Sequence, residues 1–141
     1  CRLPAAQQEA GMWRVLIVDD DFYSRKLIQE TLKGRAACDM AVNGDEALRA
    51  IGMACDDDAP YDIVLLDIAM PGMDGISFLE RLRAIEFEAG IVLGDGVPVI
   101  MVTAYEKPFL TAFNKGCDDY LLKPIDPDEL IRRIQAHVKS G

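Results

Sequence analysis

Short apolar runs that lack polar alternation constrain the fold of this chain most strongly. They lie within residues 14–18, 62–67 and 97–102, with a shorter one at 120–122. Each is too short for a helix of ordinary length, so a strand is the better interpretation. A strand that is apolar at successive positions is buried on both faces, which is typical of a parallel sheet with helices on each side. The runs therefore predict an α/β fold.

Five strand-then-helix units follow one another along the chain. A weaker strand is expected at residues 38–42, where it ends at the turn signal Asn43-Gly44, and the acidic segment 55–60 is expected to be a loop. The expected helices lie at residues 22–32, at 45–51, around 76–82, near 109–114 and from 126 onward. In the first helix, Leu27, Ile28 and Leu32 fall at helical spacing together with Phe22 or Tyr23. The last helix has Asp126 as its expected N-cap and Pro127 at its first position.

Right-handed crossovers then make a doubly wound five-stranded parallel sheet with helices on both faces, and the order 2-1-3-4-5 is expected for its strands. In such sheets a ligand site lies beyond the carboxyl ends of the strands. The polar residues that follow the first, third, fourth and fifth strands are Asp19, Asp20, Asp21, Asp67, Thr103 and Lys123. Because these strands are neighbours in the expected order, the groups should converge on one patch.

The chemistry of this patch is specific. Several carboxylates suit a hard divalent cation, and Mg²⁺ is the leading candidate. A lysine beside such a cation is sensible if an anion lies between them, and Thr103 adds a neutral donor to that anion. A carboxylate, a metal ion and a lysine together predict the formation of an acyl phosphate on aspartate. Asp21 is interpreted instead as a solvated residue at the start of the first helix.

Composition excludes several other classes of protein. At 141 residues the chain fits one domain, and its net charge of -9 argues against direct binding of nucleic acid. No apolar run approaches the roughly 20 residues that a membrane helix needs, so no membrane insertion is expected. The four cysteines form no C-x-x-C pair, which favours a reducing cytoplasm. Residues 1–12 are expected to be a disordered leader or a cloning remnant, and 13–141 the folded domain.

Four motifs in register carry a resemblance to a known family. VDDD, LLDIAMPGMDG, VTA and DDYLLKP resemble the receiver domain of two-component response regulators, from residue 14 to near residue 139. The resemblance implies a CheY-like, flavodoxin-like fold. It implies that Asp67 is the phosphoacceptor and that Asp19 and Asp20 organise Mg²⁺. The backbone carbonyl of Ala69 would be a further metal ligand.

The resemblance also implies a switch. Thr103 would be its hydroxyl, Lys123 the lysine that pairs with the phosphoryl group, and Tyr120 its aromatic side chain. Lys123-Pro124 would be a cis peptide. The spacing from Thr103 to Lys123 is somewhat shorter than usual in the family, so a short fourth helix is expected. The connection before the fourth strand is longer than usual.

The function implied is signalling, with no enzyme activity. A sensor histidine kinase or a histidine phosphotransfer protein would give its phosphoryl group to Asp67, and a downstream effector protein would read the face made by the fourth helix, fifth strand and fifth helix. Since little chain follows Lys123, a stand-alone cytoplasmic receiver is expected. Ala69 and Tyr105 offer no amide or carboxylate to orient an attacking water, which predicts slow loss of the phosphoryl group.

Two alternatives remain. A phosphatase of the haloacid dehalogenase type also uses an aspartate nucleophile after a parallel strand. It needs an acid two residues further on, and here the sequence is Asp67-Ile68-Ala69. An inactive receiver that serves only as a docking module is the second alternative, and the intact set of Asp67, Thr103 and Lys123 speaks against it.

Overall fold

The fold was obtained as a computed structural model, which describes residues 12–138 apart from 71 and 93. Five parallel strands form one sheet in the order β2-β1-β3-β4-β5, as expected. The strands are β1 (Trp13–Val18), β2 (Ala36–Ala41), β3 (Ile63–Leu66), β4 (Val99–Thr103) and β5 (Asp119–Leu122). The helices are α1 (Phe22–Thr31), α2 (Gly44–Asp56), α3 (Gly75–Glu88), α4 (Phe109–Asn114) and α5 (Pro127–His137).

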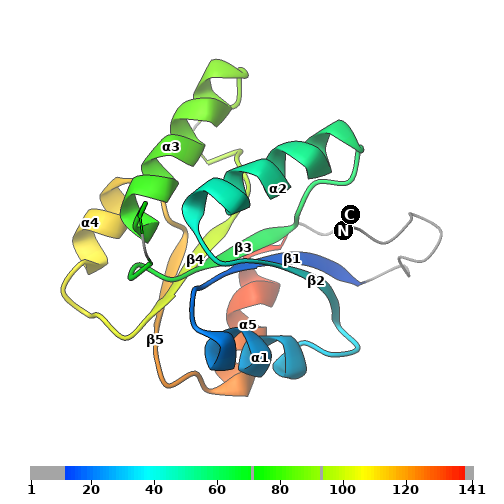
Figure 1. Ribbon diagram of the computed structural model, residues 1–141, viewed down its shortest axis with the longest axis vertical. Helices are drawn as coiled ribbons and strands as arrows, with labels where there is room; N and C mark the ends of the chain where they lie inside the picture. Colours follow the sequence, from blue (N-terminus) through cyan, green and yellow to red (C-terminus); the bar gives the residue numbers. More distant parts are fainter. Residues whose placement is uncertain (1–11, 71, 93, 139–141) are drawn as a thin grey trace.

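The helices form two layers on opposite faces of the sheet (Figure 1). Helices α2, α3 and α4 cover one face, and α1 and α5 cover the other. Successive residues of β1 alternate between the two cores: Leu16 packs with Phe78 of α3, and Ile17 packs with Ile28 of α1 and Ile134 of α5. The central strands are thus buried on both sides, which confirms the interpretation of their unbroken apolar runs.

The register of the sheet brings the carboxyl ends of its central strands to one edge. Val18 lies opposite Leu66, and Leu66 lies opposite Met101. The last residue of β4, Thr103, lies opposite Leu122 of β5. The residues that follow β1, β3 and β5 therefore emerge together, next to the end of β4.

Several element boundaries differ from the sequence prediction: α3, for example, continues to Glu88, beyond the expected 76–82, and three further differences have a physical reason. Strand β2 begins at Ala36 rather than residue 38, because its backbone pairs with β1 from Trp13 onward despite weak strand formers. Strand β4 covers Val99–Thr103 instead of 97–102, since Pro98 lacks an N–H group and Val97 donates its own to the Glu86 side chain. Helix α2 continues to Asp56, which adds the buried Ala54 to the core. The predicted acidic loop therefore begins within this helix.

The structure confirms most of the other predictions about the helices. Helix α4 has 6 residues, as the short spacing indicated. Asp126 is the N-cap of α5 and Pro127 its first residue, both as expected. In α1 the expected apolar face is only partly buried: Ile28 and Leu32 are covered, while Leu27 is 47% exposed. None of the helices in the described part of the chain is both long and apolar enough to cross a membrane.

Candidate functional site

Three carboxylates converge beyond the carboxyl ends of β1 and β3. Asp19 and Asp20 follow β1, and Asp67 follows β3. One oxygen from each can be chosen so that all three lie within 4.8 Å of one another. Asp19 and Asp67 are buried, at 2% and 7% exposure, whereas Asp20 faces solvent. The strand-end rule thus brought these three residues together correctly from the sequence.

Lys123, directly after β5, joins this cluster. Its Nζ donates to Asp19 Oδ2 at 2.8 Å, to Asp67 Oδ2 at 3.1 Å and to Ser24 Oγ at 3.1 Å. Its backbone N–H donates to the Thr103 carbonyl at 2.8 Å, which fixes where the side chain starts. The expected cis peptide between Lys123 and Pro124 is present.

The charges of the cluster perturb one another. Burial acts to lower the pKa of the Lys123 ammonium, but the hydrogen bond to Asp19 and the charges of Asp19 and Asp67 outweigh it, so the pKa is raised. Burial raises the pKa of the Asp19 carboxyl, although its bonds to Lys123 and to the Asp21 N–H act in the opposite direction. The buried negative charge of Asp19 is therefore unfavourable, and a further cation bound at the site would stabilise it.

Asp21 does not belong to the cluster. It is the N-cap of α1, and its Oδ2 accepts from Ser24 N at 3.1 Å and from Ser24 Oγ at 2.9 Å. These bonds lower the pKa of the Asp21 carboxyl, and the bond from the Ser24 hydroxyl has the largest effect. The interpretation of Asp21 as a helix-start residue is confirmed. Its backbone N–H nevertheless donates to Asp19 Oδ1 at 2.9 Å and so helps to orient that carboxylate.

Thr103 and Tyr120 are linked through one residue. Thr103 is fully buried, and its Oγ1 accepts from the backbone N–H of Tyr105 at 3.3 Å. The hydroxyl of Tyr120 donates to the carbonyl of the same Tyr105. The Tyr120 ring also packs edge-on against Phe109, with centroids 5.4 Å apart. A movement of Tyr105 would therefore reach both the site and α4.

The loop after β3 closes tightly on Asp67. Gly75 is the first residue of α3, and a Cβ there would lie 2.3 Å from the Asp67 carbonyl oxygen. Only glycine allows this approach of helix to strand end. The Ala69 N–H points toward Asp67 Oδ1 at 3.4 Å, which is a long contact. Ala69 itself is exposed beside the carboxylates.

Two site residues escaped the sequence prediction. Ser24 accepts from Lys123, and Arg25 donates to the Asp19 carbonyl at 2.8 Å. Ser24 could have been found from its position three residues after the N-cap Asp21, where a side chain faces back toward the strand end. Arg25 carries no comparable signal, because its long side chain reaches the site only through the tertiary fold.

The donor set fits a hard divalent cation. Asp19, Asp20 and Asp67 offer oxygen atoms only, as Mg²⁺ prefers, and at least one of the three is open to water. The cation would also offset the repulsion among three neighbouring carboxylates. The neighbouring Lys123 already pairs with Asp19 and Asp67.

Comparison with known proteins identifies the family. The model of the response regulator receiver domain matches residues 15–135, and the chain belongs to this family. Transcriptional regulatory protein ResD of Bacillus subtilis (strain 168) is 37% identical over 131 residues, which cover 91% of this chain and 49% of that protein. DNA-binding response regulator MtrA of Mycobacterium tuberculosis (strain ATCC 25618 / H37Rv) is 35% identical over 132 residues, 91% of this chain and 51% of that protein.

A similar solved structure is the CheX-CheY-BeF3-Mg complex from Borrelia burgdorferi. It matches with a TM-score of 0.72 and 30% identity, over 88% of this chain and 87% of that chain. The fold is thus that of a CheY-like receiver, as expected, and the chain is a receiver domain of two-component signalling. It spans about half the length of ResD and MtrA.

Proposed function

We propose that this receiver accepts a phosphoryl group on Asp67 from the phosphohistidine of a sensor histidine kinase or a histidine phosphotransfer protein. One Asp67 oxygen would attack the phosphorus, and the P–N bond would break with its electron pair returning to the imidazole. The product is an acyl phosphate on Asp67. The observation that carries the proposal is the position of Lys123, which contacts Asp67 at 3.1 Å within a cluster of three carboxylates.

Each group of the site has a part in this step. Lys123 already lies beside the acceptor, so its positive charge is in place to pair with the incoming phosphoryl oxygens. Asp19, Asp20, Asp67 and the Ala69 carbonyl would hold Mg²⁺, which supplies positive charge to those oxygens when bound. Asp19 also orients Lys123 through its 2.8 Å hydrogen bond.

The same site would drive a switch. Thr103 Oγ1 now accepts a hydrogen bond from Tyr105 N, and its own hydroxyl proton is available to a phosphoryl oxygen. If Thr103 turns toward that oxygen, Tyr105 loses one of its anchors, and Tyr105 also holds the hydroxyl of Tyr120. The phosphoryl group would in this way change the packing of Tyr120 against Phe109.

Two exposed apolar surfaces support the partners in this scheme. Phe22 and Tyr23 are 60% and 78% exposed at the start of α1, next to the site, where a phosphate donor must dock. Leu110 and Leu122 are 70% and 44% exposed on α4 and β5, the surface that Tyr120 would alter. We propose that an effector protein reads the α4-β5-α5 face. The net charge of -9 favours a protein effector over direct contact with DNA.

The cellular setting of the proposal is the cytoplasm, where phosphohistidine donors and reduced cysteines are expected together. The function proposed is signalling, and the chemistry at Asp67 is a single group transfer whose product is the switched receiver. A phosphatase of the dehalogenase type would need an acid at position 69, where the exposed residue is Ala69.

Intact mass measurement tests the proposal. The protein is incubated with acetyl phosphate and Mg²⁺, and one added phosphoryl group is expected. Asp67→Asn should abolish the adduct, and Asp21→Asn is the matched control that should keep it, because asparagine also caps a helix. No adduct on the wild-type protein would favour the docking-module alternative, and an adduct that survives in Asp67→Asn would refute the assignment of the acceptor.

A further inference from the structure

A second cavity lies at the opposite end of the sheet from Asp67. It has a volume of about 520 Å³ and opens between α2 and α3. Tyr61, which precedes β3, and Pro98, which precedes β4, line it, so it sits at the amino ends of these strands. Cavities that hold small molecules are commonly about 300–1,000 Å³. The size therefore suits a ligand, and nothing in the phosphoacceptor chemistry uses it.

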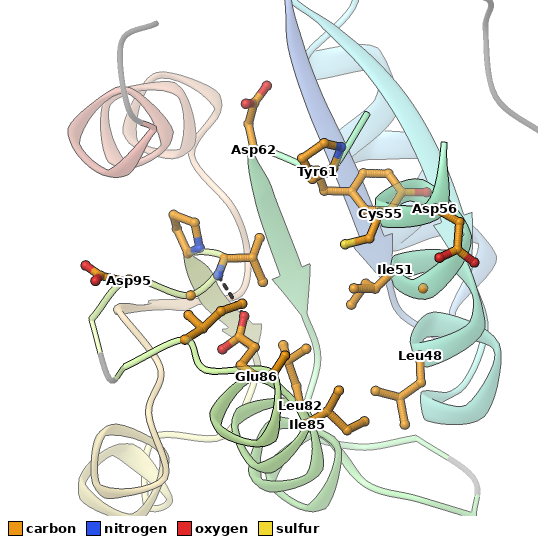
Figure 2. A pocket seen from close by; sticks show the side chains of 17 residues that line it. Leu48, Ile51, Cys55, Asp56, Tyr61, Asp62, Leu82, Ile85, Glu86 and Asp95 are labelled. Atoms are coloured by element: carbon orange, nitrogen blue, oxygen red, sulfur yellow. Dashed lines mark hydrogen bonds between the residues drawn. The ribbon is translucent and has the colours of Figure 1, made fainter. Parts of the chain in front are cut away.

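The walls of this cavity are apolar. Figure 2 shows Leu48 and Ile51 of α2 on one side, facing Leu82 and Ile85 of α3 on the other. Ile85 is 49% exposed, although it lies beside other apolar side chains. An open apolar wall in contact with water is unfavourable, and covering it would stabilise the protein.

Gly52 contributes no side chain to the wall of the cavity. It lies in the middle of α2 and lines the cavity, and a Cβ built there meets no heavy atom within 4 Å among the described residues. Glycine inside a helix costs about 1 kcal/mol relative to alanine, and here no close approach of another element requires it. A larger side chain at this exposed lining position would therefore find open space beside the cavity.

The charged side chains that line the cavity are acidic, while two arginines contact lining residues: Arg83 pairs with Glu86, and Arg14 lies over the Tyr61 ring. Asp56, Asp62, Glu86 and Asp95 line it, and none of the described lining residues is basic. Asp56 and Asp95 lie at opposite margins in Figure 2. Neither forms an ion pair with another of the described residues. The two margins at Asp56 and Asp95 favour a cation.

Glu86 brings a carboxylate into the cavity itself. Its side chain is 12% exposed, with Oε1 accepting from Arg83 at 2.8 Å and Oε2 from Val97 N at 2.9 Å. A carboxylate has about four acceptor sites, so two remain for a ligand N–H. Gly96 allows this placement, because a Cβ there would lie 2.0 Å from Glu86 Oε1. A fixed, partly desolvated acceptor thus sits beside the apolar walls.

We infer that this cavity binds a small apolar molecule with a protonated amine. The apolar body would cover Leu48, Ile51, Leu82 and Ile85, and the ammonium would donate to Glu86. Amphipathic amines are the class that fits both the walls and the charge. This inference is independent of the proposed phosphoryl transfer, since the two sites lie at opposite ends of the sheet.

Three probes of one shape test the ligand class. 4-Phenylbutylamine, 4-phenylbutan-1-ol and 4-phenylbutyrate are titrated into the unphosphorylated protein labelled with ¹⁵N. Amide shifts of the residues that line the cavity report binding. The amine is expected to bind at least about tenfold tighter than the acid, with the alcohol between them. Equal affinities for the amine and the acid, or no saturable shifts with any probe, would overturn the inference.

Variants at two positions locate the site. Gly52→Leu should fill the cavity and abolish binding of the amine and the alcohol, while the matched control Gly52→Ala should retain both within about twofold. Both should keep the fold, because each replaces glycine by a better helix former. Glu86→Gln should lower the affinity for the amine to the value for the alcohol. The affinity for the alcohol itself should not change, and this unchanged affinity shows that the variant is folded.

Two results would show that the cavity does not bind the amine. If Gly52→Leu keeps its affinity for the amine, the probe binds at another place and the inference is wrong. If sedimentation shows a dimer of the wild-type chain that Gly52→Leu dissociates, a second copy covers the cavity instead of a small molecule. A wild-type monomer that binds the amine in a Gly52-dependent manner supports the inference.

Discussion

Replacing Asp20 by asparagine should stabilise the metal-free protein, although it removes a group of the proposed metal site. Asp20 shares with Asp19 and Asp67 a cluster of oxygens within 4.8 Å. At that separation two unit charges repel by about 0.9 kcal/mol in water and about 3.5 kcal/mol at an effective dielectric constant of 20. Because Asp20 is exposed, and Lys123 pairs with the other two, the lower figure applies. We expect the free energy of unfolding to rise by roughly 1 kcal/mol.

Magnesium should cancel this advantage. At a free Mg²⁺ concentration 100 times its dissociation constant, the wild-type protein gains about 2.7 kcal/mol. If the loss of Asp20 weakens binding tenfold, the variant gains only about 1.4 kcal/mol at the same concentration. The two proteins should then have nearly equal stability, whereas the variant is the more stable one in EDTA.

Urea unfolding, followed by the fluorescence of Trp13, measures these differences, because this is the only tryptophan of the chain. Asp21→Asn is the matched control. It should be slightly less stable than wild type in EDTA, since a negative charge at the start of α1 is lost, and should gain as much from Mg²⁺ as wild type does. Equal stability of wild type and Asp20→Asn in EDTA, together with equal gains from Mg²⁺, would refute the shared metal site.

Three other predictions follow from the same geometry. Gly75→Ala should lower the free energy of unfolding by about 1–3 kcal/mol and slow formation of the phosphoryl adduct, because the alanine Cβ would meet the Asp67 carbonyl. Urea titration measures the stability and intact mass measures the adduct. Wild-type values of both would contradict the prediction. The pKa of Lys123 is raised above 10.5, so its stabilising contribution is complete below pH 10.5 and is lost as the pH rises through the higher value in the folded protein. As the pH is raised above 10.5, the free energy of unfolding measured by urea titration should therefore fall less in Lys123→Met than in wild type. An equal fall in both proteins would contradict this. The double variant with Ala69→Asn and Tyr105→Glu should lose its phosphoryl group faster than wild type, as followed by mass over time, and an unchanged rate would remove the proposed reason for slow loss.

The candidate site was accessible from the sequence because it depends on strand ends. Asp19, Asp67 and Lys123 each come directly after an apolar run, and the carboxyl ends of parallel strands meet at one edge of a sheet. The position of Asp21 was equally predictable, since a helix start directly after a strand needs an N-cap. The roles of Thr103, Tyr120 and the Ala69 carbonyl stay predictions, as does the boundary of the domain at residue 13. The residues before Met12 lie outside the described part of the chain.

Packing decided what the local patterns left open. The apolar spacing of α1 does not distinguish the buried Ile28 from the exposed Leu27, because the choice depends on how the helix is rotated against β1. The sequence likewise did not predict that α2 extends to Asp56, at the start of the acidic segment, because the extension depends on the burial of Ala54 in the core. Each of these differences arises from contacts between segments far apart in the sequence.

The sequence by itself determined the α/β class and placed Asp19, Asp20, Asp67 and Lys123 at strand ends, since hydrophobic periodicity and strand ends are local features. The strand order 2-1-3-4-5, on which their convergence depends, was assumed from the sequence and is confirmed by the sheet. Only the tertiary structure decided that Ser24 and Arg25 support the site and that Tyr105 links Thr103 to Tyr120. The cavity between α2 and α3 is of the same kind, because its shape depends on how the two helices pack. A cavity has no local pattern in a sequence, for it is made by the side chains of separate elements.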